Sequence, residues 1–528
     1  MGELRATISG IGSADLFGPH SSQWSSPPSA WVRAALACVI AAGLALRVAY
    51  PGSTAFCNDQ ARACALAEDI AGGHRQTGGL VNSGGFRNLP GFVYVLAGVW
   101  KLWPSPQALV CFTGVLNALA VLGAGWLARR WIGSAGAWWA TAFFAAGPWA
   151  IQYCRWIWAQ DLLFPAALAV YYFLWRWFAL GKRWAAAGVI LALTVLVQVH
   201  LVGVVLALAV VLLALWCRPK LPAAPLAAGA VIAVASALPY LLAGHLGVPR
   251  PGRVGYEHFW RVVPSAAMSV SGLGWQLEFR RGYPAFAESA GWRMGAYAAM
   301  TCVPLLLLGA GVISGLGRII GARRGGSAGR RTGLAMTVAL VVLIPLSFVL
   351  TGIRTSPTYL PLWYPLPFVL IGWVAARLTA RRGWRLGGAW LAPVLLAALC
   401  GQLLFFAEQL RYIHAHGGVP GSVLGRSYAG LRSDVQQAAA STGAAEVWML
   451  HEGSSGIQDE APAYMFRRAR WGRLTSGRVL IRFRDGLTPG AGRSILESLD
   501  GGRQPQQAFL VRPWRGQQQK DGRIPRQP

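Results

Sequence analysis

The sequence predicts an all-α polytopic membrane protein that ends in a small extracytoplasmic α/β domain. Three observations support this fold class. The chain of 528 residues is 55% hydrophobic and only 13% charged, about half the charge of an average soluble protein. Apolar runs of roughly 18–20 residues recur, each long enough to cross a bilayer as a helix. After about residue 409 the composition becomes polar, with short runs typical of strands.

The positive charge follows a membrane topology. The formal net charge is +29, which in a soluble protein would suggest nucleic acid. Here, five short loops after residue 128 contain sixteen Lys and Arg and no Asp or Glu, whereas loops 51–88, 151–160, 246–292 and 353–360 contain ten basic and six acidic residues. This asymmetry is the positive-inside rule. It places the basic loops in the cytoplasm and gives no reason to expect a nucleic-acid partner.

About eleven spans result, with the N-terminus in the cytoplasm, the C-terminus outside and the cell (inner) membrane as the predicted location. Residues 1–29 are expected to be a flexible cytoplasmic tail, 30–408 the transmembrane module, and 409–528 the outer domain with a disordered tail. The predicted spans are roughly 30–50, 106–128, 132–150, 160–180, 184–199, 201–217, 223–245, 293–313, 334–352, 361–378 and 386–407.

One apolar segment is too short to be a span. If Leu89–Trp103 crossed the membrane, every later basic loop would lie outside. We therefore predict a juxtamembrane helix in the first outer loop, lying in the interface with Trp100 and Trp103 at headgroup level.

In the outer domain, the runs 446–450, 478–483 and 507–512 predict strands, and 432–441 predicts a helix. The tail is expected to be disordered after about Trp514.

Acidic residues are scarce, and the topology places those in the membrane module on the outer side. Any acid–base chemistry must use this short list at the outer face. Between residues 16 and 407 the acids are Asp59, Glu68, Asp69, Asp161, Glu257, Glu278 and Glu288.

Asp59 and Asp161 are the two acids placed where a site is expected. Asp161 opens a predicted span six residues after Arg155, and an ionisable group at a membrane boundary is a functional candidate. Asp59 begins a helical pattern with Arg62 in its first turn. The spacing leaves a second interpretation open for both acids, because Asp also serves as a helix N-cap.

Basic and aromatic residues at the outer turns are candidates for binding an anion. His200 lies between two half-length apolar runs, where it is either a solvated turn residue or part of a site. Arg354 and Tyr359 occupy another outer turn, and Arg280–Arg281 lie in a long outer loop. An outward Arg suggests a ligand such as a phosphate; attraction to lipid headgroups is the alternative for both arginine positions.

The cysteines and the usual motifs exclude several other chemistries. The eight cysteines have no metal-binding spacing, and Cys57 and Cys64, both in the first outer loop, either form a disulfide or remain free thiols. The sequence has no P-loop, dinucleotide fingerprint, HExxH or CxxC pair. ATP-driven pumping is therefore not expected.

Several short motifs occur in an order that is similar to one family. Taken together they resemble the C-type (GT-C) integral membrane glycosyltransferases, in the bacterial branch related to protein O-mannosyltransferases and aminoarabinose transferases, over roughly residues 30–410. Gln60 stands where the family usually has Glu, and the Lys of its Lys-Pro-Pro motif is missing. The motifs are Asp59–Ala63, Asn88–Pro90 with Arg87 beside it, Leu127–Gly133, Pro148 with Arg155 and Asp161, and the Thr358–Phe368 stretch.

The resemblance implies transfer of a hexosyl or pentosyl group from a polyprenyl-phosphate donor to an acceptor hydroxyl, with inversion, at the outer face. It implies Asp59 as the base and Asp161 as a residue that orients the acceptor. Arg62 would hold Asp59. Phosphate and substrate contacts would come from Arg87, Arg155, His200, Arg354 and Tyr359. The acceptor would be a glycan, a lipid or a protein. No cofactor is assigned, and a divalent metal is left open.

Two other function classes remain. A transporter or flippase of lipid-linked sugars is the first alternative, but such proteins usually carry ionisable groups at mid-span and internal repeats, and the predicted spans are nearly free of ionisable groups. A non-catalytic envelope scaffold is the second; it predicts that neutralising Asp59 changes nothing.

Overall fold

The chain forms two compact units. The first comprises Met1–Pro51, Leu66–Trp275 and Ala287–Gln409, and the second Gly52–Ala65, Gln276–Phe286 and Leu410–Pro528. The computed structural model describes residues 27–81, 87–245, 257–274, 279, 282–322, 333–353, 356–380, 387–419, 425–433, 446–452, 478–484, 495–498 and 509–511.

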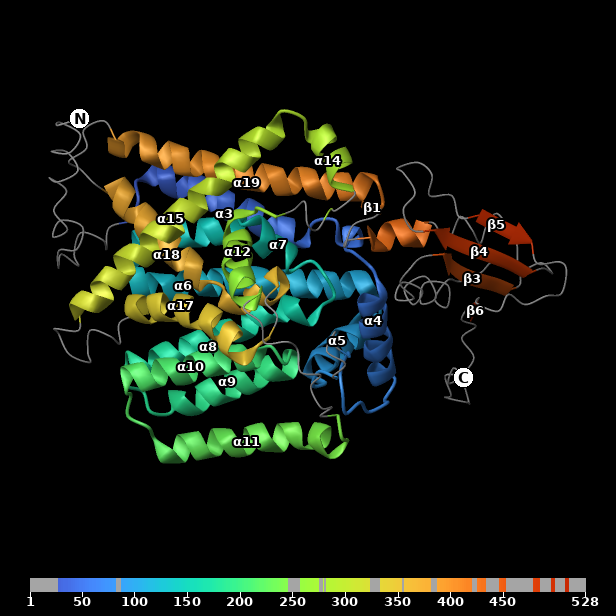
Figure 1. The fold of residues 1–528 in the computed structure, drawn as a ribbon, viewed down its shortest axis with the longest axis horizontal. Helices are drawn as coiled ribbons and strands as arrows, with labels where there is room; N and C mark the ends of the chain where they lie inside the picture. Colours follow the sequence, from blue (N-terminus) through green and yellow to red (C-terminus); the bar gives the residue numbers. More distant parts are fainter. Residues whose placement is uncertain are drawn as a thin grey trace. The chain divides into compact units, whose positions relative to one another are not determined.

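The first unit is a bundle of apolar helices, with α11 at its edge beside α9 (Figure 1). Helices α4 (Asn58–Ala71), α14 (Tyr283–Ala290) and α19 (Gly387–Ala415) have residues in both units. The remaining helical elements of the bundle are α3 (Ala30–Val48), α5 (Gly91–Leu102), α6 (Pro106–Ala146), α7 (Pro148–Gln152), η2 (Ala159–Leu162), α8 (Leu163–Phe178), α9 (Ala185–Val199), α10 (Gly203–Cys217), α11 (Ala223–Leu242), α12 (Glu257–Ser271), α15 (Arg293–Ala322), α17 (Gly333–Thr351), η5 (Pro357–Trp363) and α18 (Leu366–Ala380).

The protein is a multi-pass membrane protein. In the described part of the chain, six helices are long and apolar enough to cross a membrane, and the bent pair η5–α18 would make a seventh. Helices α8, α9 and α10 have 16, 15 and 15 residues, which at about 1.5 Å per residue is shorter than a bilayer core of roughly 30 Å. The count of eleven spans therefore stays a prediction. Helix α5 has 12 residues, too few to cross, with Trp100 buried and Trp103 exposed.

A glycine divides the longest helix into two antiparallel halves. Within α6, Gly133 has φ 81° and ψ 176°, a region that is essentially restricted to glycine. A Cβ at Gly125 would lie 2.3 Å from Oγ1 of Thr141, and the Thr113 hydroxyl donates to the carbonyl of Cys154 at 3.2 Å. Residues before and after Gly133 therefore pack side by side, in agreement with the two spans predicted at 106–128 and 132–150.

The second half of α6 ends against a buried arginine. Pro148 has no N–H, so it cannot donate to the carbonyl of Phe144 in the usual helical pattern. The fully buried Arg47, at the end of α3, donates to that carbonyl at 3.0 Å and to the carbonyl of Ala145 at 2.8 Å. Its side chain thus satisfies backbone acceptors that the helix end leaves open.

The second unit contains two small sheets. Strands β1 (Gly418–Val419) and β2 (Gly425–Arg426) pair antiparallel. The other sheet has the order β5-β4-β3-β6, with β3 (Glu446–Glu452) parallel to β4 (Arg478–Arg484). Strands β5 (Ile495–Ser498) and β6 (Phe509–Val511) pair antiparallel at its edges. The three predicted strands are confirmed and β5 was missed; most of the helix predicted at 432–441, and the tail after Trp514, lie outside the described residues.

Candidate active site

The short, largely aromatic segment between α7 and α8 is held in place by Asp161. This residue is fully buried in the short turn η2, before α8 begins. Its Oδ2 accepts a hydrogen bond from the backbone N–H of Trp156 at 2.8 Å. The side chain of Asn117, on α6, donates to the backbone carbonyl of Asp161 at 2.7 Å. Asp161 is therefore no N-cap of α8, because it closes the preceding loop instead.

The other carboxylate oxygen of Asp161 is unusual. Oδ1 is buried and has no hydrogen-bond partner among the described residues. Burial raises the pKa of the Asp161 carboxyl well above its usual range, although the amides of Trp156 and Trp158 favour the charged form. A buried carboxyl oxygen without a partner is costly unless water or a ligand reaches it, which keeps Asp161 a candidate site residue.

Arg155 anchors the same loop to the end of α3. It is buried, and its guanidinium donates to the carbonyl of Leu46 and, at 3.2 Å, to the carbonyl of Tyr50. Burial lowers the pKa of Arg155 to about 10, so the side chain remains charged at neutral pH. No ion pair joins Arg155 and Asp161 in the described structure. Two donors of this arginine are thus committed to backbone carbonyls.

His200 and Tyr359 are brought together from distant parts of the sequence. His200 follows α9, and its ring lies 5.3 Å from the ring of Tyr359 on η5. Nδ1 of His200 accepts from the backbone N–H of Val202 at 3.1 Å, so the proton of the neutral ring is on Nε2. Burial lowers the pKa of His200 to about 4. His200 is therefore a neutral residue whose Nε2–H makes no hydrogen bond to a described residue.

Three elements converge at this point in the first unit. Turn η2, which holds Asp161, contacts both η5 and α9. The segment before α5 approaches from another side, since Oδ1 of Asn88 accepts from the backbone N–H of Leu201 at 3.4 Å. The structure thus gathers the elements that carry Asp161, His200 and Tyr359, and the role of these residues stays a prediction.

Arg87 lies next to Asn88, and its backbone is fixed. The Tyr240 hydroxyl, on α11, donates to the carbonyl of Arg87 at 2.6 Å, while the side chain of Arg87 is exposed. Thr77 Oγ1 lies 2.9 Å from Nε2 of His245, a hydrogen bond that ties the same segment to the end of α11. The exposed guanidinium is consistent with a binding role. Arg354 lies outside the described residues.

Asp59 and Arg62 are both exposed on the first turns of α4. Gln60 occupies the position three residues after Cys57, where its Oε1 accepts from the backbone N–H of Cys57 at 3.0 Å. In a capping box, the side chain three residues into the helix bonds back to the backbone N–H of the N-cap residue. Cys57 is therefore the N-cap residue of α4, and Asp59 is not. Gln60 is fully buried, and its Nε2 has no partner among the described residues.

The thiols of α4 are not bridged. Cys57 and Cys64 are not joined by a disulfide in the structure, so the first of the two possibilities left by the sequence, a disulfide, is excluded. Burial raises the pKa of Cys57 to about 11, so this thiol is protonated at neutral pH. In the described part of the chain, no group of three or more His, Cys, Asp or Glu side chains is placed to hold a metal ion.

An apolar groove runs between α9 and α11. Its volume is about 240 Å³. Gln198 and Leu89 belong to its lining; in the sequence Gln198 is two residues before His200, and Leu89 follows Asn88. Nε2 of Gln198 donates to the carbonyl of Ser236, another lining residue, at 3.0 Å. The groove is lined by Leu89, Ile190, Leu193, Thr194, Val197, Gln198, Ala233, Ser236 and Ala237.

Several residues of this region were not predicted. Arg47, the last polar residue of the first span, had a signal in the sequence as the one cation within that apolar run after Arg33. Asn117 had no signal, and Asn88 was named only as part of the Asn88–Pro90 motif, because the contacts of both depend on backbone groups brought close only by the fold.

Comparison with known proteins shows the fold. No family model matches the sequence, and no match was found among curated proteins. The chain is similar in structure to ArnT from Cupriavidus metallidurans bound to undecaprenyl phosphate, with a TM-score of 0.50 and 12% identity, over 84% of this chain and 85% of that one.

Two further structures are similar at lower scores. The apo state of the same ArnT gives a TM-score of 0.49 with 14% identity over 83% and 84% of the two chains. The arabinofuranosyltransferase AftD from Mycobacteria gives 0.41 with 17% identity over 82% and 30%. The similarity to the undecaprenyl-phosphate-bound ArnT, at a TM-score of 0.50, is what shows a GT-C-like fold for this chain.

Proposed function

We propose that this protein is a glycosyltransferase that moves a sugar from a polyprenyl-phosphate donor to an acceptor hydroxyl, with inversion, at the outer face of the cytoplasmic membrane. The observation that carries the proposal is the fold shared with ArnT, whose structure holds undecaprenyl phosphate, over 84% of this chain. The apolar groove between α9 and α11, whose lining includes Leu89 and Gln198, supports a lipid-linked donor.

The reaction defines what the residues must do. The acceptor oxygen attacks the anomeric carbon, the bond from that carbon to the phosphate oxygen breaks, and polyprenyl phosphate leaves with the electron pair. The acceptor hydroxyl loses its proton to a base, and hydrogen-bond donors stabilise the charge on the departing phosphate.

Asp59 is proposed as the base. It is exposed on the first turn of α4, near the positive end of the helix dipole. Arg62 lies one turn away on the same helix and would hold the carboxylate in position. An ionised, solvent-reachable carboxylate is what removal of a hydroxyl proton requires.

The remaining candidates divide into positioning and phosphate-binding residues. Asp161 and Arg155 fix the loop between α7 and α8, so we assign them to positioning the acceptor side of the site. The neutral Nε2–H of His200, the hydroxyl of Tyr359 and the guanidinium of Arg87 are proposed donors to the phosphate, together with Arg354.

The test is native mass spectrometry of the purified protein in gentle detergent. The wild type and Asp59→Asn should both carry a polyprenyl-phosphate sugar, whose mass names the sugar. With a cell-envelope extract, only the wild type should release bare polyprenyl phosphate, and Asp59→Asn should lose at least about a thousandfold in rate. Asp69→Asn, exposed on the same helix, is the matched control and should retain the rate.

Other outcomes would contradict the proposal. Equal turnover by Asp59→Asn and wild type would exclude Asp59 as the base. A bound lipid-linked sugar that is never cleaved, but crosses vesicle membranes in the presence of the protein, would indicate a transporter or flippase. Absence of any such lipid would favour a scaffold. Adding EDTA to the same assay tests whether a divalent metal is needed.

A further inference from the structure

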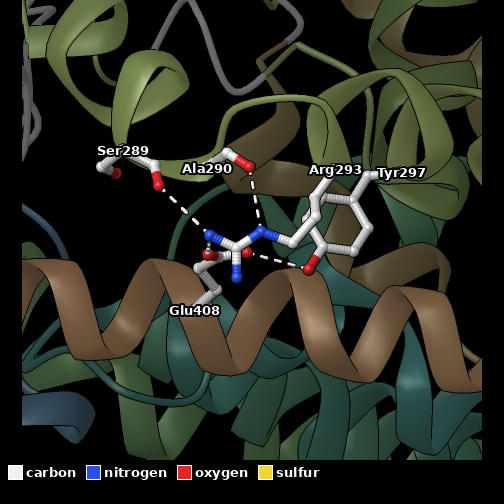
Figure 2. A network of polar contacts seen from close by, with 5 residues as sticks. All are labelled: Ser289, Ala290, Arg293, Tyr297 and Glu408. Atoms are coloured by element: carbon white, nitrogen blue, oxygen red, sulfur yellow. Dashed lines mark hydrogen bonds and ion pairs between the residues drawn. The ribbon is translucent and has the colours of Figure 1, made fainter.

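Helix α15 carries an arginine near each end, and the first is neutralised. Arg293 NH2 lies 2.7 Å from Oε1 of Glu408 on α19, and the hydroxyl of Tyr297 donates to Oε2 of the same carboxylate at 2.8 Å. Arg293 also donates to the carbonyls of Ser289 and Ala290 at the end of α14 (Figure 2). This cation therefore has both a counter-charge and backbone acceptors.

The second arginine has a different environment. Arg318 lies 25 residues further along α15, roughly 37 Å away in a continuous helix. Its guanidinium carbon lies 5.3 Å from the ring centroid of Trp373 on α18, and that of Arg377 lies 4.2 Å from the same centroid. Arg318 is half-buried, and its Nε has no hydrogen-bond partner among the described residues.

The packing of α15 on α18 fixes this arginine cluster, which we define as Arg318, Trp373 and Arg377. A Cβ at Gly311 would lie 3.0 Å from Cβ of Leu370, so the two helices approach closely one to two turns before the cluster. Trp373 is 7% exposed and is therefore a rigid platform for both guanidinium groups.

The stretch of sequence that carries the cluster contains no carboxylate. The sequence has no Asp or Glu between Glu288 and Glu408, a stretch that includes all of α15, α17 and α18 and the loops between them. The loops that follow Arg318 and Arg377 add further arginines, at 323, 324, 330, 331, 381, 382 and 385. The positive charge at this end of the bundle is thus local and without an acidic neighbour in sequence.

Electrostatics favours an anion at this position. Both guanidinium groups lie close to one ring, within the roughly 10 Å over which exposed charges act at ordinary salt, so they repel each other. Stacking on Trp373 offsets only part of this repulsion. Exposed apolar residues on the same helix, Leu306 and Ile313, provide a surface for acyl chains, and basic pockets between spans bind anionic headgroups.

We propose that the arginine cluster binds the phosphate headgroup of an anionic membrane phospholipid, with the acyl chains along the lipid-facing side of α15. The site lies at the end of α15 opposite to the Arg293–Glu408 pair and does not depend on the proposed glycosyl transfer. A lipid bound here would clamp α15 to α18 by bridging a cation on each helix.

The experiment compares lipid binding by the full-length protein in detergent. Native mass spectra are recorded after adding phosphatidylglycerol or phosphatidylcholine to the wild type, the double variant Arg318→Gln/Arg377→Gln, and Arg129→Gln. Arg129 is an exposed arginine of another basic loop and gives the matched control. We expect the double variant to lose at least about fivefold in bound phosphatidylglycerol, and the wild type and Arg129→Gln to retain it.

Further arms separate the explanations. The variant Arg318→Lys/Arg377→Lys keeps the charge and should keep most of the binding, and Arg318→Gln alone should lose about twofold if the double variant does not fold. Equal phosphatidylglycerol binding by the double variant and the wild type would overturn the proposal. Displacement of the lipid by millimolar inorganic phosphate, or equal binding of phosphatidylcholine, would also overturn it.

Discussion

Buried polar groups around the loop between α7 and α8 are satisfied mainly by backbone atoms. Arg47 and Arg155 both donate to carbonyls at helix ends, and Asp161 accepts from the amide of Trp156. In the described structure none of these three side chains forms an ion pair. Their hydrogen bonds to the backbone therefore fix the local geometry, and such bonds are strong in a low-dielectric interior. Replacing any one of them would leave a carbonyl or an amide without its partner.

Titration of one residue, His200, is expected to make the free energy of unfolding depend on pH. The unfolded histidine takes up a proton near pH 6.5, but burial lowers the pKa of folded His200 to about 4. Between these values the unfolded state binds more protons, so the free energy of unfolding falls as the pH falls. From pH 7 to pH 5 we expect a loss of about 2 kcal/mol from this group.

Thermal unfolding in detergent at pH 7 and pH 5 checks this. His200→Gln should reduce the difference between the two melting temperatures, because the variant has no group to titrate. His74→Gln, at an exposed histidine, should leave the difference unchanged. An acid sensitivity of His200→Gln equal to that of the wild type would show that His200 is not the cause.

At the scale of elements, the break in α6 depends on one residue. Gly133 has φ 81° and ψ 176°, so Gly133→Ala should lower the free energy of unfolding by about 1–3 kcal/mol. Gly98→Ala is the control: Gly98 lies mid-helix in α5 with nothing within 4 Å of an added Cβ, and Ala there should be neutral or stabilising. Melting temperatures of the two variants measure the contrast; an unchanged melting temperature of Gly133→Ala would show that the break does not require glycine.

The elements also show how far the sequence predicts the structure. Hydropathy located α3, the two halves of α6 and α17, because apolar length is a property of the local sequence. It predicted a span at 160–180 that is longer than helix α8, because α8 begins only at Leu163, after an irregular loop. The loop forms because Asp161 bonds to Trp156 and Asn117, and such tertiary contacts leave no periodic signal. Strand β5, with four residues, is too short for a pattern.

The residues of the candidate site were named from the sequence, and their roles stay predictions. The predicted outer turns contain the candidates His200, Tyr359 and Asp161, and the fold brings the elements that carry them together. The contacts of Asn88 and Arg47 could not be predicted from the sequence. Each side chain bonds to a backbone group more than 90 residues away in the chain, and only folding brings the two together.

At the scale of the whole molecule, the distribution of charge predicts the orientation in the membrane. The basic loops contain no acids, and the arginine cluster on α15 and α18 lies at the end of these helices from which two such loops leave. If these loops face the cytoplasm, as the positive-inside rule requires, the Arg293–Glu408 pair at the other end of α15 lies near the outer face. Asp161 and His200 would then also lie outside.

Reporter fusions test this orientation. Alkaline phosphatase fused after residue 219 should be inactive and green fluorescent protein at the same site fluorescent, because loop 218–220 is predicted to be cytoplasmic. Fusions after residue 416 should give the opposite result. Cytoplasmic signals from both sites would place the second unit inside, where a donor carried at the outer leaflet could not meet Asp59, and would remove the basis for an outer-face glycosyltransferase. The orientation therefore decides whether the scarce acids of this chain are where the proposed reaction needs them.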